Sequence, residues 1–431
     1  MRPENPQACA PASFAAVVTY DTQASVEHRF WRHFRLLWLG QLLSAVGDRL
    51  HSVALVWIAV QAASSDAGWV LAAGAAGRLV FGLIGGAYAD RVDRQRLIVA
   101  CDLGCAAAVL LLAFVDLRGP AALWWLAGVS FVVGTLDAFV QPALQASLPM
   151  LAPDRASLQR ANAWLDVNRR LAMALGPAIT GMLLAVLPLV HFFALDALTF
   201  VASAIAVRAL GRGYAWAVQA GTQREPFWLS ISAGMRAAWA HRLLSWGIAQ
   251  AGLWNLVLTP ALSLGAALLV HDELHAGPEW LGYVLAAYGV GNVLANLVVA
   301  RLDALPTGRT LFAGAMVAAL GWMLFAVTTN VWLLLIVTAF TAIGGPMADL
   351  MLLRMIQNDF APHQVGRIFS LRSTFSRTAS AVGMLLAVFC YGAFGPRWAI
   401  GLGGALLLGF AFAGWWLVGR QHDARTIARA T

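Results

Sequence analysis

Long apolar runs separated by short polar stretches make up most of this chain. A helix of about 20 apolar residues crosses the hydrocarbon core of a bilayer, and windows of that length predict twelve membrane-spanning helices. Their expected ranges are 36–62, 67–88, 97–117, 122–145, 161–187, 189–210, 243–269, 280–300, 310–327, 332–356, 368–393 and 398–418. The composition agrees, because 60% of the 431 residues are hydrophobic and only 12% are charged, whereas a soluble domain carries about 25% charge. We therefore expect an all-α membrane protein.

The arginines give these helices an orientation. All 29 basic residues are Arg, and there is no Lys. If both termini lie in the cytoplasm, 21 Arg fall in cytoplasmic tails, loops and the helix ends beside them (Arg208 and Arg354 included), two fall in loops on the other side and six fall deeper within helices. Cytoplasmic loops carry the positive excess, so the sequence predicts a multi-pass protein of the cell inner (cytoplasmic) membrane. The net charge of +8 then reflects topology and does not indicate nucleic-acid binding.

One long interruption divides the spans six plus six. The expected organisation is a cytoplasmic tail at 1–35, a six-helix bundle at 36–210, a cytoplasmic linker at 211–242, a second six-helix bundle at 243–418 and a cytoplasmic tail at 419–431. The first tail lacks the pattern of a signal peptide and is expected to be poorly ordered. An apolar stripe from Phe227 to Trp239 predicts a helix lying in the membrane interface. The halves also repeat, because Asn162–Gly176 aligns with Phe369–Gly383, and such repeats place a substrate site near the midplane.

Polar residues on the first spanning helix form the clearest candidate site. At steps of three or four, the helix carries Gln41, Ser44, Asp48, His51 and Ser52, a polar stripe on an otherwise apolar helix. Asp48 lies about 12 residues from the cytoplasmic end, roughly 18 Å deep at 1.5 Å per residue. A charge at that depth costs about 2.5–3.5 kcal/mol. Three interpretations stay open: an ion pair with Arg78 or Arg49, proton coupling together with His51, or direct contact with a substrate.

Further charges lie nearer the cytoplasmic ends of the spanning helices. They are Asp137, Asp166, Arg169 and Arg170 in the first half, and Asp349, Arg372 and Arg377 in the second. Asp166 and Arg170 are four residues apart and therefore share one helix face. These residues either brace each half with a salt bridge or form an Arg-rich cavity floor that attracts acidic ligands.

Other chemistries find no support in the sequence. The four cysteines lack the spacing of a disulfide framework or a metal site. His271–His275 holds two histidines and two acids but not in the His-Glu-x-x-His order of zinc sites, and it is expected to be a solvated loop. Without Lys, the phosphate-binding Gly-x-x-x-x-Gly-Lys motif is impossible. No nucleophile, base and orienting group converge, so we expect no enzyme, no cofactor and no metal.

The loop Gly86–Arg96 reads Gly-Ala-Tyr-Ala-Asp-Arg-Val-Asp-Arg-Gln-Arg. Its Gly-x-x-x-Asp-Arg-x-x-Arg-x-Arg spacing resembles the signature loop between helices 2 and 3 of major facilitator superfamily transporters. In that family the Gly permits close helix approach, and the Asp docks against the other half when the cytoplasmic side is shut. The resemblance implies a twelve-helix major facilitator fold with a conformational gate of Gly86, Asp90, Arg91 and Arg94. The alternative is a charge cluster that only sets topology.

Two further stretches resemble exporters of that superfamily. Gly176-Pro177-Ala178-Ile179-Thr180-Gly181 in the fifth helix is similar to their Gly-Pro motif, although the usual second adjacent Gly is missing. A simple kink with small-residue packing at Gly176, Pro177 and Gly181 is the alternative. The opening Arg35–Gln41, followed by Gly47-Asp48, resembles the bacterial drug and siderophore exporter branch.

These resemblances imply a function. The expected activity is export of a small amphipathic molecule, such as a drug, siderophore or other secondary metabolite, by proton antiport and alternating access. The expected partners are the substrate, protons and the lipid bilayer, and the protein is expected to be monomeric. Uptake or facilitated diffusion of a polar metabolite is the alternative within transport. A non-transporting receptor or scaffold is the alternative outside transport, and the retained repeat and gate loop argue against it.

Overall fold

The structure is a computed structural model of the chain. It describes residues 12–89, 91–119, 121–184, 186–211, 235–236, 239–299, 301 and 306–423. Within these residues every regular element is a helix. The expected all-α fold is therefore confirmed for the part of the chain that the structure describes.

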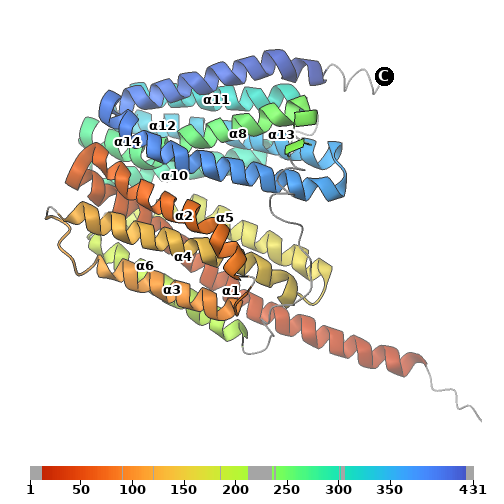
Figure 1. Cartoon of the computed structure of the whole chain (residues 1–431). Coiled ribbons are helices and arrows are strands. Elements are labelled where there is room, and N and C mark those ends of the chain that lie inside the picture. Colours follow the sequence, from red (N-terminus) through yellow and green to blue (C-terminus); the bar gives the residue numbers. More distant parts are fainter. Residues whose placement is uncertain are drawn as a thin grey trace, which may run out of the picture.

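Two helical bundles lie against each other, one from each half of the sequence (Figure 1). The first contains α1 (Ala12–Ala63), the short 3-10 helix η1 (Ser64–Ala67), α2 (Gly68–Ala89), α3 (Arg94–Leu111), α4 (Ala122–Leu151), α5 (Arg155–Leu184) and α6 (Val190–Gly211). The second begins with α8 (Arg242–Pro260), which continues through η2 (Ala261–Gly265), α9 (Ala266–Leu268) and η3 (Leu269–Glu273). It then contains α10 (Pro278–Val299), α11 (Thr307–Val327), α12 (Val331–Thr341), α13 (Gly344–Asp359), α14 (Pro362–Gly414) and η4 (Trp415–Gly419).

Twelve helical rods in the described residues correspond to the twelve expected spans. Eight stretches are long and apolar enough to cross a membrane. Two of these, Phe30–Gly82 and Arg367–Asp423, are 53 and 57 residues long and contain two rods each. In the second of them, α14 breaks at Gly395, whose φ of 75° favours glycine. The remaining rods, α3 and α5, carry charged residues and so escape a purely apolar criterion.

The repeat seen in the sequence recurs in the packing. A Cβ on Gly176 of α5 would lie 2.7 Å from Arg49 Cγ of α1, and a Cβ on Gly383 of α14 would collide with the Leu256 carbonyl oxygen of α8. The fifth rod of each half therefore crosses the first rod of that half at the same glycine of the repeat. Small residues at such crossings let helix backbones approach closely.

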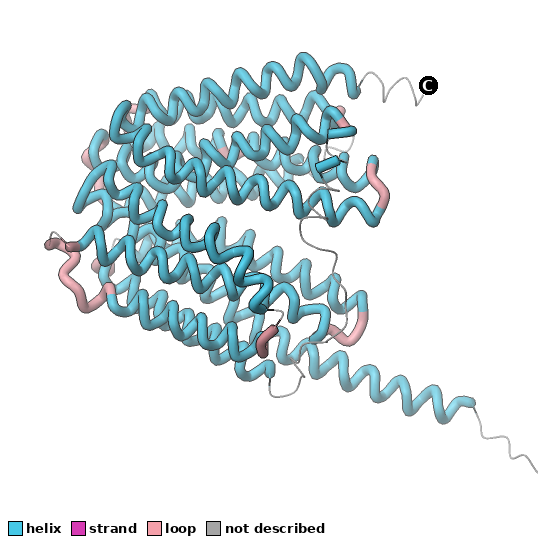
Figure 2. The backbone as a smooth tube through the Cα atoms, in the orientation of Figure 1, coloured by secondary structure: helices cyan, strands magenta, loops and turns pink. Residues whose placement is uncertain are grey.

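The two ends of the molecule are packed differently. The Arg-rich end is the one that carries the connections α2–α3, α4–α5 and α10–α11, and the opposite end carries η1, the α3–α4 connection and residues 274–277. One buried cluster at the opposite end combines residues of both bundles, from Leu50–Val60 of α1 to Ala266–Val270 of the second half. Toward the Arg-rich end each bundle has its own core, and the two bundles diverge (Figure 2).

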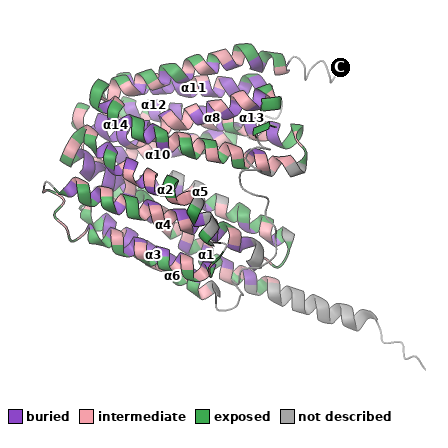
Figure 3. Cartoon of the chain, in the orientation of Figure 1, coloured by how far each residue is buried: buried purple, intermediate pink, exposed green. Residues whose placement is uncertain are grey.

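The outward surfaces of both bundles are apolar. Exposed positions follow the outside of the rods (Figure 3), and the exposed large side chains include Phe114, Trp124, Leu294, Ile336 and Phe389. Such side chains favour lipid over water as their solvent. The chain is therefore a multi-pass membrane protein.

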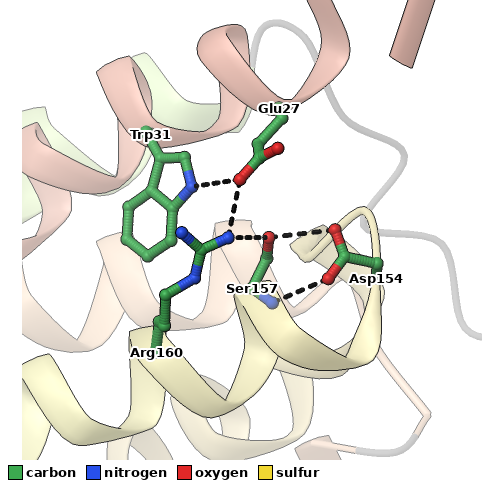
Figure 4. Close-up of polar contacts among 5 residues, drawn as sticks. All are labelled: Glu27, Trp31, Asp154, Ser157 and Arg160. Carbon is green, nitrogen blue, oxygen red and sulfur yellow. Dashed lines mark hydrogen bonds and ion pairs between the residues drawn. The ribbon is translucent and has the colours of Figure 1, made fainter. Parts of the chain in front are cut away.

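The prediction of a poorly ordered N-terminal tail is wrong from Ala12 onward, because α1 begins there and continues into the first span; residues 1–11 lie outside the described residues. Phe30 and Phe34 on this extension are buried. A polar cluster fastens the extension to the start of α5 (Figure 4). Arg160 Nη2 lies 2.6 Å from Glu27 Oε1, and the guanidinium lies 5.1 Å from the centre of the Trp31 ring.

The start of α5 is itself capped. The Asp154 carboxylate accepts hydrogen bonds from the Ser157 backbone N–H (2.8 Å) and hydroxyl (3.0 Å), and the backbone bond in particular lowers the pKa of Asp154. An acidic cap also interacts favourably with the positive end of the helix dipole. Both the N-terminal extension and α5 are thus anchored at the Arg-rich end.

Of the expected linker helix, only residues 235–236, 239–240 and the start of α8 lie within the described residues. Met235 and Trp239 have exposed side chains there. The rest of the linker, 212–234, and the C-terminal tail after Asp423 lie outside the described residues.

Candidate functional site

The middle of α1 brings a carboxylate into the interior of the first bundle. Asp48 and Arg49 have exposed side chains, whereas every residue from Val53 to Val60 is buried. An exposed carboxylate pointing into lipid would be very costly. Instead, the charged groups that act on Asp48 are Arg49 on its own helix, Arg78 of α2, Asp102 of α3 and Asp137 of α4. Asp48 therefore faces other charged groups of the first bundle.

No direct ion pair to Asp48 forms among the described residues, so neither Arg49 nor Arg78 clamps it in this conformation. Other acids of the molecule do form ion pairs within 4.0 Å, so Asp48 differs from them. The structural ion pair expected as one role of Asp48 is not formed here. Both arginines act on the carboxylate only at longer range.

Asp137 links the site to the second bundle. Its carboxylate accepts a hydrogen bond from Gln141 Nε2 (3.4 Å), and it lies within the electrostatic reach of Arg78 and of Arg377 on α14. Arg377 has an exposed side chain. Because Asp137 and Arg377 belong to different bundles, this pair would change its separation if the bundles moved relative to each other.

Behind Asp48, His51 of α1 meets Asp196 of α6. His51 Nδ1 lies 3.6 Å from Asp196 Oδ2, and both side chains are buried, at 8% and 1% exposure for the whole residues. Thr199 Oγ1 donates to Asp196 Oδ1 (3.3 Å), while His51 Nδ1 and Asp196 Oδ2 find no hydrogen-bond partner among the described residues. The contact depends on Gly47, because a Cβ there would lie 2.6 Å from Asp196 Oδ1.

A fourth acid, Asp102 of α3, also lies in the interior. It accepts a hydrogen bond from the Ser203 hydroxyl of α6, and Ser203 Oγ accepts from Gln41 Nε2 of α1 (3.1 Å). Asp102 is only 4% exposed, and its Oδ2 atom has no hydrogen-bond partner among the described residues. Asp102 is not among the site residues expected from the sequence, although a lone acid eight residues into a largely apolar helix was the available signal.

These residues form one acid cluster, which contains Asp48, Asp102, Asp137 and Asp196. Each comes from a different helix of the first bundle: α1, α3, α4 and α6. Charged groups inside a membrane-spanning bundle are costly and commonly mark a proton or substrate pathway. A cluster of carboxyl groups has the chemistry to bind protons or cationic groups.

In the second half, Asp349 of α13 pairs with Arg372 of α14, with 2.5 Å between Oδ1 and Nη2. Arg377 faces the first bundle instead, as described above. The expected charges of the second half thus divide into one ion pair within the bundle and one cation that faces the acid cluster.

Several expected site residues cannot be placed. The described residues do not include Asp90. They also leave out the surroundings of Gly86, Asp166, Arg169, Arg170, Pro177 and Gly181. Of the expected gate residues that are described, Arg91 is exposed, while Arg94 is buried and donates to the Ala146 carbonyl of α4 (3.1 Å). That contact of Arg94 lies within the first bundle.

The opposite end is closed by contacts between the bundles. Ser64 Oγ donates to Asp272 Oδ2 (2.7 Å), and the Trp57 ring packs edge-on against His271 at 5.3 Å between ring centres. His271 Nδ1 lies 2.6 Å from Asp272 Oδ1. The prediction that 271–275 is merely a solvated loop is wrong for His271 and Asp272, because both belong to η3 and are only partly exposed.

We expect Asp272→Ala to weaken this closure. The substitution removes the Ser64 hydrogen bond, worth about 1 kcal/mol, and should shift the ratio of closed to open forms about five-fold. Spin labels at Asp66 and His275, both exposed, should then show a larger population at long distance. Asp116→Ala, in the α3–α4 connection, is the matched control. Unchanged distances in Asp272→Ala would mean that apolar packing alone holds this end shut.

No group of three or more His, Cys, Asp or Glu residues suited to a metal ion occurs in the part of the chain that the structure describes. The arrangement instead places four acids and an imidazole in the first bundle, within the electrostatic reach of Arg377 on the second bundle. This combination of two bundles, one closed end and a charged interior is that of a transporter.

Comparison with known proteins agrees with this architecture. Residues 29–430 match the family model described as "Transmembrane secretion effector". The multidrug efflux pump Tap of Mycolicibacterium fortuitum is 26% identical over 375 residues, covering 82% of this chain and 87% of Tap. Macrolide efflux protein A of Streptococcus pyogenes is 22% identical over 381 residues, covering 87% of this chain and 93% of that protein.

Solved structures share the fold. A bacterial homologue of the lysosomal transporter Spinster, in an inward-facing and unoccupied conformation, has a TM-score of 0.69 at 13% identity, covering 91% of this chain and 98% of that one. A bacterial homologue of the iron transporter ferroportin, in an inward-facing state, has a TM-score of 0.66 at 16% identity, covering 88% and 99%. The chain is therefore a member of the transmembrane secretion effector family within the major facilitator superfamily, a group of membrane transporters and not of enzymes.

Proposed function

We propose that this protein exports small amphipathic molecules across the inner membrane in exchange for protons. The Arg-rich end lies in the cytoplasm in this proposal, together with both termini, because 21 Arg fall on that side and two on the other and because cytoplasmic loops carry the positive excess. The conformation described above is then open toward the cytoplasm and closed toward the outside.

The observation that carries the proposal is the acid cluster beside His51. Four carboxylates in the interior of one bundle, with a cation facing them from the other bundle, are expensive in a membrane and indicate a proton or substrate pathway. The relatives named as efflux pumps support the outward direction of transport. The proposed substrates are drugs, siderophores or other secondary metabolites.

In the proposed cycle, Asp48 is loaded and unloaded with a proton in turn. In the conformation open to the outside, Asp48 takes up a proton, and the substrate leaves. Rocking of the bundles then closes the outer end and opens Asp48 toward the cytoplasm, where fewer protons are available. Asp48 consequently releases its proton to the cytoplasm as the next substrate enters. His51 and Asp196, directly behind Asp48, provide a second place for that proton.

The test is proton movement coupled to substrate movement. Purified protein in liposomes that contain a pH-sensitive dye should change the pH of the lumen when a macrolide such as erythromycin is added. Export by antiport requires that an imposed pH gradient, acidic on the side of the closed end, accelerates substrate movement toward that side. Substrate movement that ignores the pH gradient would overturn proton antiport and favour facilitated diffusion.

The proposed orientation has its own prediction. In a background that lacks the native cysteines, Arg91→Cys and Asp116→Cys should react with a membrane-impermeant maleimide from opposite sides. Arg91 should be labelled only after the cytoplasmic side is opened, and Asp116 in intact cells. Both positions are exposed, so equal labelling from one side would contradict the twelve-span topology.

A further inference from the structure

The second bundle contains a recess among its helices. It lies between α8, α11 and α13 and, with the space at its mouth, measures about 340 Å³. Its walls are mostly apolar or small, and its lining residues include Gly247, Trp254, Ala315, Gly345 and Leu352. Most of that volume is open space at the mouth, and the part enclosed by protein is only large enough for a small group. The recess can therefore take the polar tip of a ligand, such as a hydroxyl or an amide.

One buried amide points into this recess. Gln250 of α8 lines it and is only 3% exposed. Neither its Nε2 nor its Oε1 atom has a hydrogen-bond partner among the described residues. Leaving a buried donor or acceptor unpaired costs about 1–3 kcal/mol, so an amide with both atoms unpaired needs an external partner that both donates and accepts.

The charge around the recess determines what that partner is. Asp349 lies at the recess, but its carboxylate is already paired with Arg372 at 2.5 Å. The recess therefore offers no net charge and no unpaired ion to a ligand. Trp254 supplies an aromatic wall, and its ring lies 3.6 Å from where a Cβ on Gly345 would be. The chemistry fits a neutral group with N–H or O–H donors and an oxygen acceptor on an apolar body.

The recess has a counterpart in the first bundle with different chemistry. The helices α8, α11 and α13 are the first, third and fourth rods of the second half. Their counterparts in the first half, α1, α3 and α4, carry Asp48, Asp102 and Asp137. The same place in the two bundles is thus acidic in one and neutral but hydrogen-bonding in the other.

We propose that the Gln250 recess binds the neutral, hydrogen-bonding end of the transported molecule, while the acid cluster handles protons. This inference rests on the proposed export function and assigns the two tasks to different bundles. A primary amide, sulfonamide or hydroxyl group would pair with both Gln250 atoms, and the apolar part of the molecule would lie along Trp254.

Binding can be tested without transport. The probes are dansylamide, whose sulfonamide has N–H donors and oxygen acceptors, and N,N-dimethyldansylamide, which keeps only the acceptors. Both are neutral, and binding is measured in nanodiscs by energy transfer from tryptophan to the dansyl group. The wild type should bind dansylamide about ten-fold more tightly than its dimethyl analogue. Gln250→Leu should bind the two equally, and Gln61→Leu, at an exposed position on α1, should keep the ten-fold preference.

A second measurement guards against misfolding of the variant. Without ligand, Gln250→Leu should melt at the same temperature as the wild type or higher, because it removes two unpaired polar atoms. If the wild type binds both probes equally, or if Gln250→Leu keeps the preference, water alone occupies the recess and the inference is overturned. A lower melting temperature of Gln250→Leu would likewise overturn it, by assigning the amide a structural role. If the wild type prefers dansylamide ten-fold but shows no proton-coupled transport, the binding role of the recess is supported and the antiport proposal is overturned.

Discussion

Asp48→Asn is expected to abolish transport driven by a pH gradient while leaving substrate exchange intact. Asn has nearly the shape of Asp but cannot bind or release a proton in this range. Asp48 is the member of the acid cluster with an exposed side chain, and Arg49 and Arg78 act on it without an ion pair. Among the acids of the cluster it is therefore the one best placed to exchange protons with the space between the bundles. Proton movement induced by substrate in liposomes should fall at least ten-fold.

The same liposomes provide the controls for Asp48. Exchange of labelled for unlabelled substrate across the membrane needs no net proton movement, so it should persist in Asp48→Asn. Asp66→Asn, an exposed acid in η1, should behave as the wild type does. If Asp48→Asn still couples protons to substrate, the carrier is the His51–Asp196 pair behind it. Loss of exchange as well would assign Asp48 to substrate binding.

How much of this site the sequence could predict depends on the kind of interaction. The polar stripe on α1 follows from helical periodicity, so Asp48 and His51 were visible in the sequence. The contact between His51 and Asp196 was not, because apolar runs define spans without saying which rods are neighbours. The pairing depends on Gly47, which lets α6 come close to α1.

The fold was more predictable than the site for a physical reason. Hydrocarbon solvates only long apolar helices, and that requirement appears directly in the sequence as apolar runs. The break at Gly395 and the small residues at helix crossings also leave local signals. The N-terminal extension of α1 leaves no such local signal. Its position depends on Arg160, more than a hundred residues away, which pairs with Glu27 at 2.6 Å. The neutrality of the Gln250 recess likewise depends on a distant pair, Asp349 with Arg372.

The second bundle contains a very close helix crossing, where α13 starts against α11. A Cβ on Gly344 would lie 2.7 Å from Ala318 N and closer still to the Gly314 carbonyl oxygen, and real Cβ atoms essentially never come within 3.0 Å of such atoms. These are backbone atoms, which cannot rotate away as a side chain can. Gly344→Ala must therefore push the two helices apart, at a cost of about 3 kcal/mol.

The matched control for Gly344→Ala is Gly409→Ala in α14, because nothing lies within 4 Å of where its Cβ would be. Ala is a better helix former than Gly by about 0.8–1.0 kcal/mol, so this variant should be as stable as the wild type or more so. Thermal unfolding, followed by fluorescence-detected size exclusion, should thus show different effects of the same Gly→Ala change at the two positions. Gly344→Ala should melt at a clearly lower temperature and yield less folded protein. Equal melting temperatures for the two variants would mean that α11 and α13 do not cross as closely as the structure has them.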